Sequence, residues 1–234
     1  MRFNRFIINC DLSREELEIE DPRVVHQLSR VLRARAGEII FLSTGRSLQE
    51  AKAEIKEINK KKVKVKIISL TSKEVEPNTE LTVFSSLIKK DRFEWLLEKA
   101  TELGVRKIVP ILADRTVKLN FKRRRWEKII LEATEQSGRV LLPELSQAIS
   151  LKEALGEAKE NDFNLFFHAS GEEASEFDKK NRRIGVFIGP EGGWSEKELQ
   201  LAGSHGLGLT SLGKTVLRSE TAGIAASALI LLES

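Results

Sequence analysis

The sequence predicts an α/β protein with a mostly parallel sheet, preceded by a smaller, mostly β domain. From residue 80 onwards, apolar strand-like runs alternate with helix-like segments, and repeated βα units imply a parallel sheet with helices on both faces. Residues 1–70 instead alternate apolar with charged side chains, the period of half-buried strands. Residues 71–79 are polar, contain Pro77 and lack periodicity, so we expect them to link the two domains.

The N-terminal domain is expected to be a small barrel that carries one helix. The pattern predicts strands over residues 2–8, 38–43, 51–58 and 63–68, and a helix over residues 21–32. Pro22 suits the first turn of that helix. The run Asn59-Lys60-Lys61-Lys62 is expected to be the hairpin loop between the last two strands.

The C-terminal domain should contain at least five strands and five helices. Strands are expected over residues 81–88, 107–112, 163–167, 184–188 and 207–212, and helices over 91–103, 121–137, 151–159, 195–203 and 219–232. Asp91 is the expected N-cap of the first helix and Gly104 its C-terminal stop. Ser150 with Glu153, and Ser195 with Glu198, have the spacing of capping boxes.

Composition excludes several classes of protein. Of the 234 residues, 41% are hydrophobic and 32% are charged, which is typical of a globular protein. No apolar run approaches the roughly 18 residues of a membrane span, and the N-terminus lacks the apolar core of a signal peptide. Cys10 is the single cysteine and the three histidines lack ligand spacing. We therefore expect a cytoplasmic protein with no metal site and no membrane partner.

The net charge of +4 is unevenly distributed along the chain. Residues 1–76 hold 16 Lys and Arg against 12 Asp and Glu, whereas residues 77–234 hold 23 of each. A basic module joined to a neutral one favours binding of a polyanion such as RNA, with Arg2, Arg5, Arg33 and Arg35 as candidate contacts. The alternative is that the lysine-rich surface only keeps the protein in solution.

Two glycine-anchored loops near the C-terminus carry most of the functional information. Each follows an apolar run and opens into a helix, and in α/β sheets ligands bind beyond the carboxyl ends of such strands. The first is Ile188-Gly189-Pro190-Glu191-Gly192-Gly193, and the second is Leu212-Gly213-Lys214-Thr215-Val216-Leu217-Arg218. If the first loop were a phosphate loop, Lys-Ser/Thr should follow its last glycine, but Trp194-Ser195 follows instead. The alternative is a pair of tight turns with no ligand.

Charged and small residues surround the start of the last helix. Ser219 or Thr221 is the expected cap, and Glu220 suits the positive end of the helix dipole. Arg218 is either a functional cation or the partner of Glu220 in a surface ion pair.

Further basic residues precede two earlier helices. Lys89 and Lys90 follow the strand at 81–88, Arg124 lies in a run of four cations before Trp126, and Arg139 ends the same helical region. Such a run can hold phosphates beside a stacking aromatic side chain, although a solvated helix face is the common alternative.

Taken together, these motifs resemble the RsmE family of small-subunit ribosomal RNA methyltransferases, within the SPOUT class. The resemblance rests on an ordered set that spans nearly the whole chain: Arg5-Phe6, His26-Gln27-Leu28 with Val31-Leu32-Arg33, Lys99 to Val105, Glu135 to Arg139 with Pro143, Ile188 to Gly193, and Leu212 to Ala222. The last two motifs together are highly specific. Trp194 replaces an expected phenylalanine-like residue, which preserves an aromatic side chain.

The resemblance implies a PUA-like RNA-binding domain followed by a SPOUT domain with a deep trefoil knot within about residues 160–234. It implies a homodimer that uses S-adenosyl-L-methionine to methylate N3 of a uridine in 16S ribosomal RNA of the small subunit. Arg218 would then stabilise charge on the uracil, and Glu191 or Glu220 would accept the proton. The donor would be held by Phe167, His168, Ile188, Gly189, Pro190, Glu191, Gly192, Gly193, Leu212, Gly213, Val216, Leu217 and Arg218.

Two other classes of function compete with this interpretation. A non-catalytic RNA-binding assembly factor would share the basic module but would not bind a methyl donor. A nucleotide hydrolase would use the first glycine loop for phosphate, against which the missing Lys-Ser/Thr argues.

Overall fold

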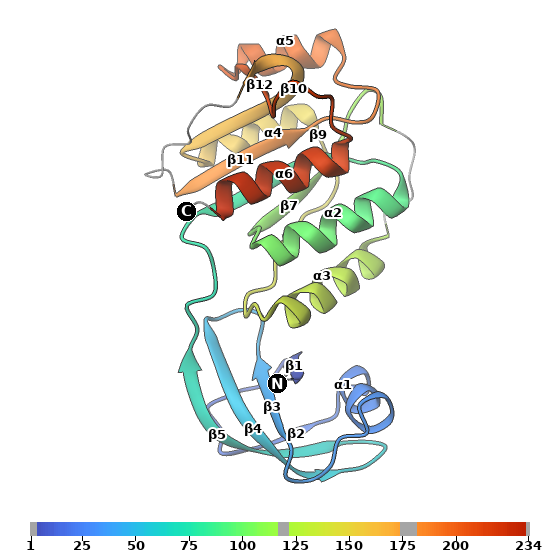
Figure 1. The fold of residues 1–234 in the computed structure, drawn as a ribbon, viewed down its shortest axis with the longest axis vertical. Coiled ribbons are helices and arrows are strands. Elements are labelled where there is room, and N and C mark those ends of the chain that lie inside the picture. Colours follow the sequence, from blue (N-terminus) through green and yellow to red (C-terminus); the bar gives the residue numbers. More distant parts are fainter. Residues whose placement is uncertain (1–3, 117–121, 174–181, 233–234) are drawn as a thin grey trace. The chain divides into compact units, whose positions relative to one another are not determined.

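The computed structural model describes residues 4–116, 122–173 and 182–232, which divide into two compact units (Figure 1). The N-terminal unit comprises residues 1–76 together with residues 134–142. The C-terminal unit comprises residues 77–133 together with residues 143–234. The N-terminal unit is therefore built from two separate stretches of the chain.

The N-terminal unit contains a five-stranded sheet of order β1-β3-β4-β5-β2. Its elements are β1 (Asn4–Ile7), β2 (Glu16–Ile19), α1 (Pro22–His26), the π-helix η1 (Gln27–Val31), β3 (Ile39–Ser43), β4 (Gln49–Ile58) and β5 (Val63–Ser72). β1 pairs in parallel with β3 and the other pairs are antiparallel. Among the described residues the edge strands β1 and β2 are not paired with each other, so the expected closure into a barrel is not seen there.

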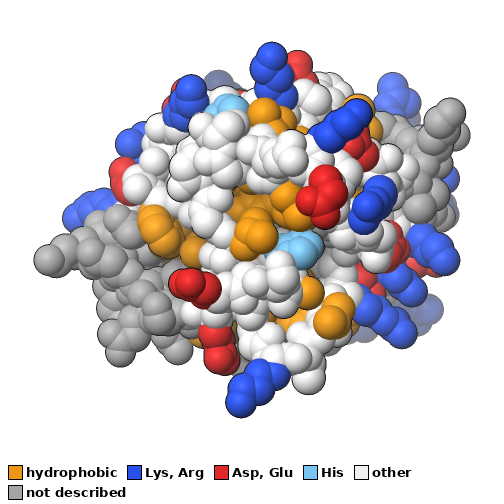
Figure 2. All heavy atoms as spheres, turned by 90° about the horizontal axis from the view of Figure 1, so that it is seen from above, with side chains coloured by type: hydrophobic (Ala, Val, Ile, Leu, Met, Phe, Trp, Pro, Cys, Tyr) orange, Lys and Arg blue, Asp and Glu red, His pale blue; other side chains and the backbone are white. Residues whose placement is uncertain are grey.

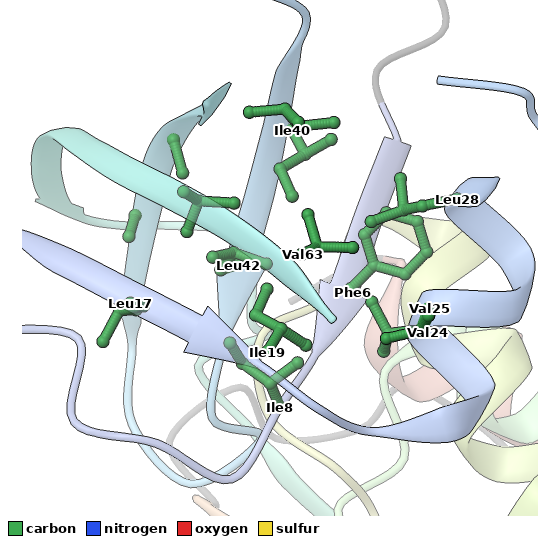
Figure 3. Close-up of a cluster of buried hydrophobic side chains, with 14 of the residues drawn as sticks. Phe6, Ile8, Leu17, Ile19, Val24, Val25, Leu28, Ile40, Leu42 and Val63 are labelled. Carbon is green, nitrogen blue, oxygen red and sulfur yellow. The ribbon is translucent and has the colours of Figure 1, made fainter. Parts of the chain in front are cut away.

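The core of this unit lies between the sheet and its helix (Figure 3). Phe6 from β1, Leu17 from β2 and Leu42 from β3 are almost fully buried. Val24, Val25 and Leu28 extend from α1 and η1 toward Phe6 and cover the open side of the sheet. Asp21 accepts a hydrogen bond from the backbone N–H of Arg23 and caps α1, and Pro22 occupies its first turn as expected.

Two carboxylates attach residues 134–142 to this unit. Glu135 accepts hydrogen bonds from the Ile7 N–H at 2.8 Å and from Arg23 Nη1 at 2.8 Å. Glu76 accepts from Arg139 Nε at 2.9 Å and Nη2 at 2.7 Å. Its other oxygen, Oε1, accepts from the backbone N–H groups of Val140 and Leu141, at 3.1 Å each.

The C-terminal unit is built on a parallel sheet of order β12-β10-β11-β6-β7-β8, with β9 also paired to β7. Its strands are β6 (Glu80–Ser86), β7 (Lys107–Leu112), β8 (Glu144–Leu145), β9 (Ile149–Ser150), β10 (Phe163–Glu173), β11 (Arg183–Ile188) and β12 (Leu209–Ser211). Its helices are α2 (Lys90–Leu103), α3 (Arg123–Ser137, whose last turn belongs to the N-terminal unit), α4 (Leu151–Glu157), the 3-10 turn η2 (Ala158–Glu160), α5 (Glu196–Ser204) and α6 (Ser219–Leu231). Every described strand pair in this sheet is parallel, as the βα alternation predicts.

Helices cover both faces of the parallel sheet (Figure 1). α6 packs on β6 and β11 and lies beside α2. Gly223 of α6 has no Cβ, which leaves room for the Leu96 side chain of α2. The opposite face packs against α4 and α5, and there the rings of Phe84, Phe166 and Phe187 stack on one another. Both faces are therefore buried, which explains the apolar runs of the strands.

Most of the expected elements are confirmed, with differences at their ends. The capping boxes of Ser150 and Ser195 are present, and Gly104 ends α2 in the left-handed region with φ of 107°. The expected Asp91 cap is wrong, because α2 begins at Lys90 after Lys89 and no side chain caps it. The expected cap of α6 by Ser219 or Thr221 is also wrong, because Arg218 occupies the N-cap position without a side-chain hydrogen bond.

Candidate functional site

A pocket of about 370 Å³ lies in the C-terminal unit at the carboxyl ends of β11 and β12, beside the middle of β10. Both glycine loops line it, together with the segment around Phe167 and His168 in β10. Figure 2 views the end of the molecule that carries α5 and β12, where apolar side chains gather in the middle and charged side chains of both signs surround them. The volume falls within the roughly 300–1,000 Å³ of small-molecule sites.

The structure brings most of the expected donor-binding residues to this one pocket. Those that line it are Phe167, His168, Ile188, Gly189, Pro190, Glu191, Gly193, Leu212, Gly213, Val216, Leu217 and Arg218. Gly192 and Glu220 are not among the lining residues. Eight others line it that were not among the individually named donor-binding residues, although Thr215 belongs to the second loop: Arg92, Ala169, Trp194, Thr210, Ser211, Thr215, Ser219 and Ala222.

The first loop, residues 189–195, folds over a buried tryptophan. The indole N–H of Trp194 donates to the Phe167 carbonyl at 3.2 Å, which ties the loop to β10. A Cβ added at Gly189 would lie 2.9 Å from the indole nitrogen, so only glycine fits there without a shift. Gly193 adopts φ of 71° and donates its N–H to the Pro190 carbonyl at 2.9 Å. The glycines therefore keep the backbone of this loop open to the pocket.

The loop after β7 supports the first loop from outside the pocket. Arg115 Nη1 donates to the Gly192 carbonyl at 2.8 Å, and the Ser195 hydroxyl donates to Asp114 at 2.5 Å. The Asp114 N–H in turn donates to Glu198 at 3.0 Å, inside the capping box of α5. These bonds fix the loop before any ligand arrives, which reduces the entropy lost on binding.

The second loop, residues 212–218, turns at Gly213, whose φ of 126° favours glycine. The Ser211 hydroxyl donates to the Gly213 carbonyl and accepts from its N–H, at 3.2 Å each. Val216 and Arg218 are exposed, and Val216 retains 84% of its accessible surface. The described residues include no carboxylate within ion-pair distance of Arg218, so the expected alternative of an Arg218–Glu220 pair is wrong.

One guanidinium holds both carboxylates that the sequence offered as proton acceptors. Arg92 from α2 contacts Glu191 at 3.2 Å and Glu220 at 3.6 Å. The Glu220 side chain is only 4% exposed, whereas the Glu191 side chain is 28% exposed. Glu220 Oε2 is buried and has no hydrogen-bond partner among the residues that the structure describes. Arg92 is therefore the main neutralising group for Glu220.

Replacing Arg92 by glutamine is expected to destabilise the protein by about 1–3 kcal/mol, because the Glu220 charge stays buried without its cation. Adding Glu220→Gln should recover part of this loss. Urea unfolding of the single and double variants measures both effects. Lys99→Gln removes partly exposed ion pairs with Glu98 and Glu102 on the same helix and should cost less than about 1 kcal/mol. An Arg92 variant as mild as this control would contradict the assignment.

His168 lies in the pocket wall with one ring nitrogen engaged. Its Nδ1 accepts the N–H of Ser170 at 3.2 Å and lies 2.8 Å from the Ser170 hydroxyl. This contact fixes the orientation of the ring within the wall. In the described part of the chain, no three His, Cys, Asp or Glu side chains are grouped to hold a metal ion.

The expected RNA contacts fall into different environments. Arg33, Arg35, Lys89 and Arg124 are exposed. Arg5 pairs with Glu50 at 3.1 Å and lies over the Phe41 ring. Lys90 is the first residue of α2, and Arg2 lies outside the described residues.

Arg139 does not fit the expected contact role. It is buried and donates two hydrogen bonds to Glu76 Oε2, so its guanidinium supports the fold instead of facing a phosphate. No helix of the described residues is long and apolar enough to cross a membrane.

Comparison with known proteins identifies both parts of the chain. Residues 75–231 match the family model of an RNA methyltransferase domain, and residues 21–68 match that of an RNA methyltransferase PUA domain. The ribosomal RNA small subunit methyltransferase E of Rickettsia conorii is 32% identical, covering 99% of this chain and 96% of its own. The enzyme of the same name from Bacillus subtilis is 30% identical over 85% and 83% of the two chains.

Two solved structures resemble the whole chain. A methyltransferase from Legionella pneumophila, solved with bound SAM, has a TM-score of 0.89 at 31% identity, covering 98% of this chain and 97% of its own. The ribosomal RNA small subunit methyltransferase E of Neisseria gonorrhoeae, bound to S-adenosyl methionine, has a TM-score of 0.88 at 31% identity, covering 97% and 96%. By its two matched domains and its full-length relatives, the chain belongs to the ribosomal RNA small subunit methyltransferase E family of RNA methyltransferases.

Proposed function

We propose that this protein transfers a methyl group from S-adenosyl-L-methionine to N3 of a uridine in 16S ribosomal RNA. The observation that carries the proposal is the pocket, which the two glycine loops after the parallel strands β11 and β12 build together with the middle of β10. Two relatives with the same fold are solved with the methyl donor. Family membership supports ribosomal RNA as the methyl acceptor.

The residues of the pocket suit this donor. Gly189 and Gly213 line the pocket without a side chain, so the backbone of each loop can approach a ligand closely, and Ile188, Leu212 and Leu217 supply apolar walls. The first glycine loop lacks the Lys-Ser/Thr of a phosphate loop. The second loop contains Gly213-Lys214-Thr215, but β12 occupies the residues just before Gly213 and the next helix begins only at Ser219, so the loop does not lead directly into a helix as a phosphate loop does.

Once bound, the donor supplies a methyl group on positively charged sulfur, so the protein need only align the acceptor and manage its proton. Arg218 stands exposed at the pocket, and its charge would stabilise the negative charge that develops on the uracil oxygens. Glu191 lines the same pocket and is partly exposed, so we propose it, ahead of the buried Glu220, as the acceptor of the N3 proton. Arg92 would hold the carboxylate in position.

Calorimetry with S-adenosyl-L-methionine tests the donor site directly. We expect saturable binding of one donor per chain, whereas a non-catalytic RNA-binding factor would show none. Mapping N3-methyluridine in 16S RNA from a strain that lacks the gene, with and without the restored protein, tests the acceptor. Unchanged methylation in the deletion strain would refute the proposed reaction, and turnover of ATP or GTP would support a hydrolase instead.

We also propose a functional division of the chain. Residues 1–70 would bind RNA and residues 80–234 would carry out catalysis, with residues 71–79 between them. The exposed Arg33, Arg35, Lys89 and Arg124 would contact phosphates, along with Arg5. The site of action would be the cytoplasm, where ribosomal RNA is assembled.

The deep trefoil knot within about residues 160–234 is a further proposal. The path of the chain supports it: the chain reaches β12 at the edge of the sheet, and the next helix, α6, then packs on the inner strands β6 and β11. An experimental structure in which this return path passes outside the preceding loop would contradict it.

The homodimer implied by the family resemblance is likewise a proposal. A monomeric mass in light scattering at micromolar concentration would contradict it.

A further inference from the structure

A short turn in the N-terminal unit combines an irregular backbone with exposed apolar and basic side chains. We call residues 30–35 the basic turn; it spans the end of the π-helix η1 and the residues that follow. π-Helical turns are rare and occur often at functional sites. Arg33 is also the one non-glycine residue in the described ranges with positive φ, at 52°.

The inner side of this turn is anchored in the core. Leu28 is fully buried and points toward Phe6 (Figure 3), and Ala34 is buried after the turn. The Leu32 N–H donates to the Gln27 carbonyl at 2.8 Å, and the Ala34 N–H donates to the Leu28 carbonyl at 2.9 Å. The turn is therefore held by its backbone and by Leu28 and Ala34, so its outward side chains are not needed for the fold.

The outward side chains form a patch of mixed character. Val31 is 63% exposed and Leu32 is 40% exposed. Arg30, Arg33 and Arg35 flank them, all exposed. None of the three has an ion pair within the described ranges, whereas Arg23 on the same helical segment pairs with Glu135.

The conformation of Arg33 indicates that its side chain is kept for a purpose other than folding. The left-handed region crowds the Cβ of any L-residue, and glycine adopts it without that cost. The chain nevertheless places an arginine there, and its guanidinium has no partner in the described structure. Strained positions of this kind are concentrated at functional sites.

We propose that the basic turn binds RNA by two means at once, and this rests on the proposed function. Its three arginines contact phosphates, and Val31 with Leu32 packs against the face of an unpaired base. Sequence-specific RNA recognition favours unpaired bases, whose faces are apolar, whereas the phosphates are anionic. A symmetric contact between two copies would place the arginines against one another, so charge argues against self-association.

Binding of full-length variants to a 16S RNA transcript and to a fully paired RNA duplex separates the two means. Val31→Ser with Leu32→Ser should weaken transcript binding about fivefold to tenfold, leaving the duplex affinity and the salt dependence unchanged. Ile68→Ser with Leu70→Ser is the matched control, because these exposed apolar residues belong to β5, which contains none of the three arginines, and it should change neither affinity.

Arg33→Gly tests the charge without disturbing the backbone. We expect an unchanged or higher melting temperature, since glycine relieves the strained conformation, and a salt slope of transcript binding reduced by about 1. Arg14→Gly, which removes an exposed arginine paired with Asp11, should leave the slope unchanged.

Three results would overturn this inference. The first is unchanged RNA affinity in the Val31/Leu32 variant, and the second is an equal loss of affinity for transcript and duplex. The third is a smaller mass of this variant than of the wild-type protein in light scattering, which would show that the turn mediates self-association. Donor binding in the same variants keeps this test separate from the proposed function. If the wild-type protein binds no S-adenosyl-L-methionine but RNA binding still depends on the turn, the proposed reaction fails and this inference stands.

Discussion

Replacing Arg218 by alanine is expected to slow methyl transfer about 100- to 1,000-fold, the typical loss when one charge-stabilising group is removed. Arg218 lines the pocket at the N-terminus of α6, its side chain is exposed, and no carboxylate neutralises it in the described structure. Its charge is therefore available to the acceptor. Single-turnover rates with labelled donor measure the effect, and calorimetry should show donor affinity nearly unchanged.

Two further variants sharpen this test. Lys214→Ala removes an exposed cation from the same loop that does not line the pocket, and we expect full activity. Arg218→Lys keeps the charge without the planar guanidinium, and its methyl-transfer rate should lie between the rates of Arg218→Ala and of the wild-type protein. An alanine variant that loses donor binding in proportion to its rate would make Arg218 a ligand of the donor, and full activity would remove it from the reaction.

Replacing Gly189 by valine is expected to weaken binding of S-adenosyl-L-methionine at least 100-fold, equivalent to about 2.7 kcal/mol. A Cβ at this position would lie 2.9 Å from the indole nitrogen of Trp194, and the extra methyl groups worsen the clash. The displaced indole would lose its bond to the Phe167 carbonyl, so both walls of the pocket would move together.

Neighbouring glycines provide matched controls for this variant. Gly203→Ala introduces a Cβ with no atom within 4 Å, and donor binding should be normal. Gly192→Ala meets only the flexible Arg115 side chain, at 3.4 Å, and should have a small effect. Circular dichroism checks that the valine variant is folded. If it is not, Gly213→Ala tests the second loop, where φ of 126° disfavours alanine in open surroundings. Tight donor binding in folded Gly189→Val would contradict the site.

Sequence reasoning succeeded where the determining interactions are local. Ser195 and Glu198 are three residues apart, and the side chain of each accepts a hydrogen bond from the backbone N–H of the other. The start of α5 could therefore be predicted from the sequence alone. The same holds for Ser150 with Glu153, and for Gly104 as the end of α2. The two glycine loops are likewise local signals, and the pocket they form was predicted because parallel strands end at a common edge.

Long-range pairing explains what sequence reasoning missed. Arg92 is 99 residues from Glu191, and their contact depends on β6 lying beside β11, an adjacency that no local pattern encodes. Arg139 was taken for an RNA contact because its partner Glu76 is 63 residues away. The short strands β2, β8 and β9 were missed because two to four residues carry too little periodicity.

The two-part construction of the N-terminal unit constrains how the protein is made and how it can be rearranged. Glu76 and Glu135 satisfy groups from both stretches of chain, so the first 76 residues alone leave Glu76 without Arg139 and Arg23 without Glu135. This unit therefore cannot complete its folding on the ribosome until residue 142 has left the exit tunnel, after more than half of the polypeptide has been synthesised. A gene fusion or truncation with a single junction cannot transplant it intact.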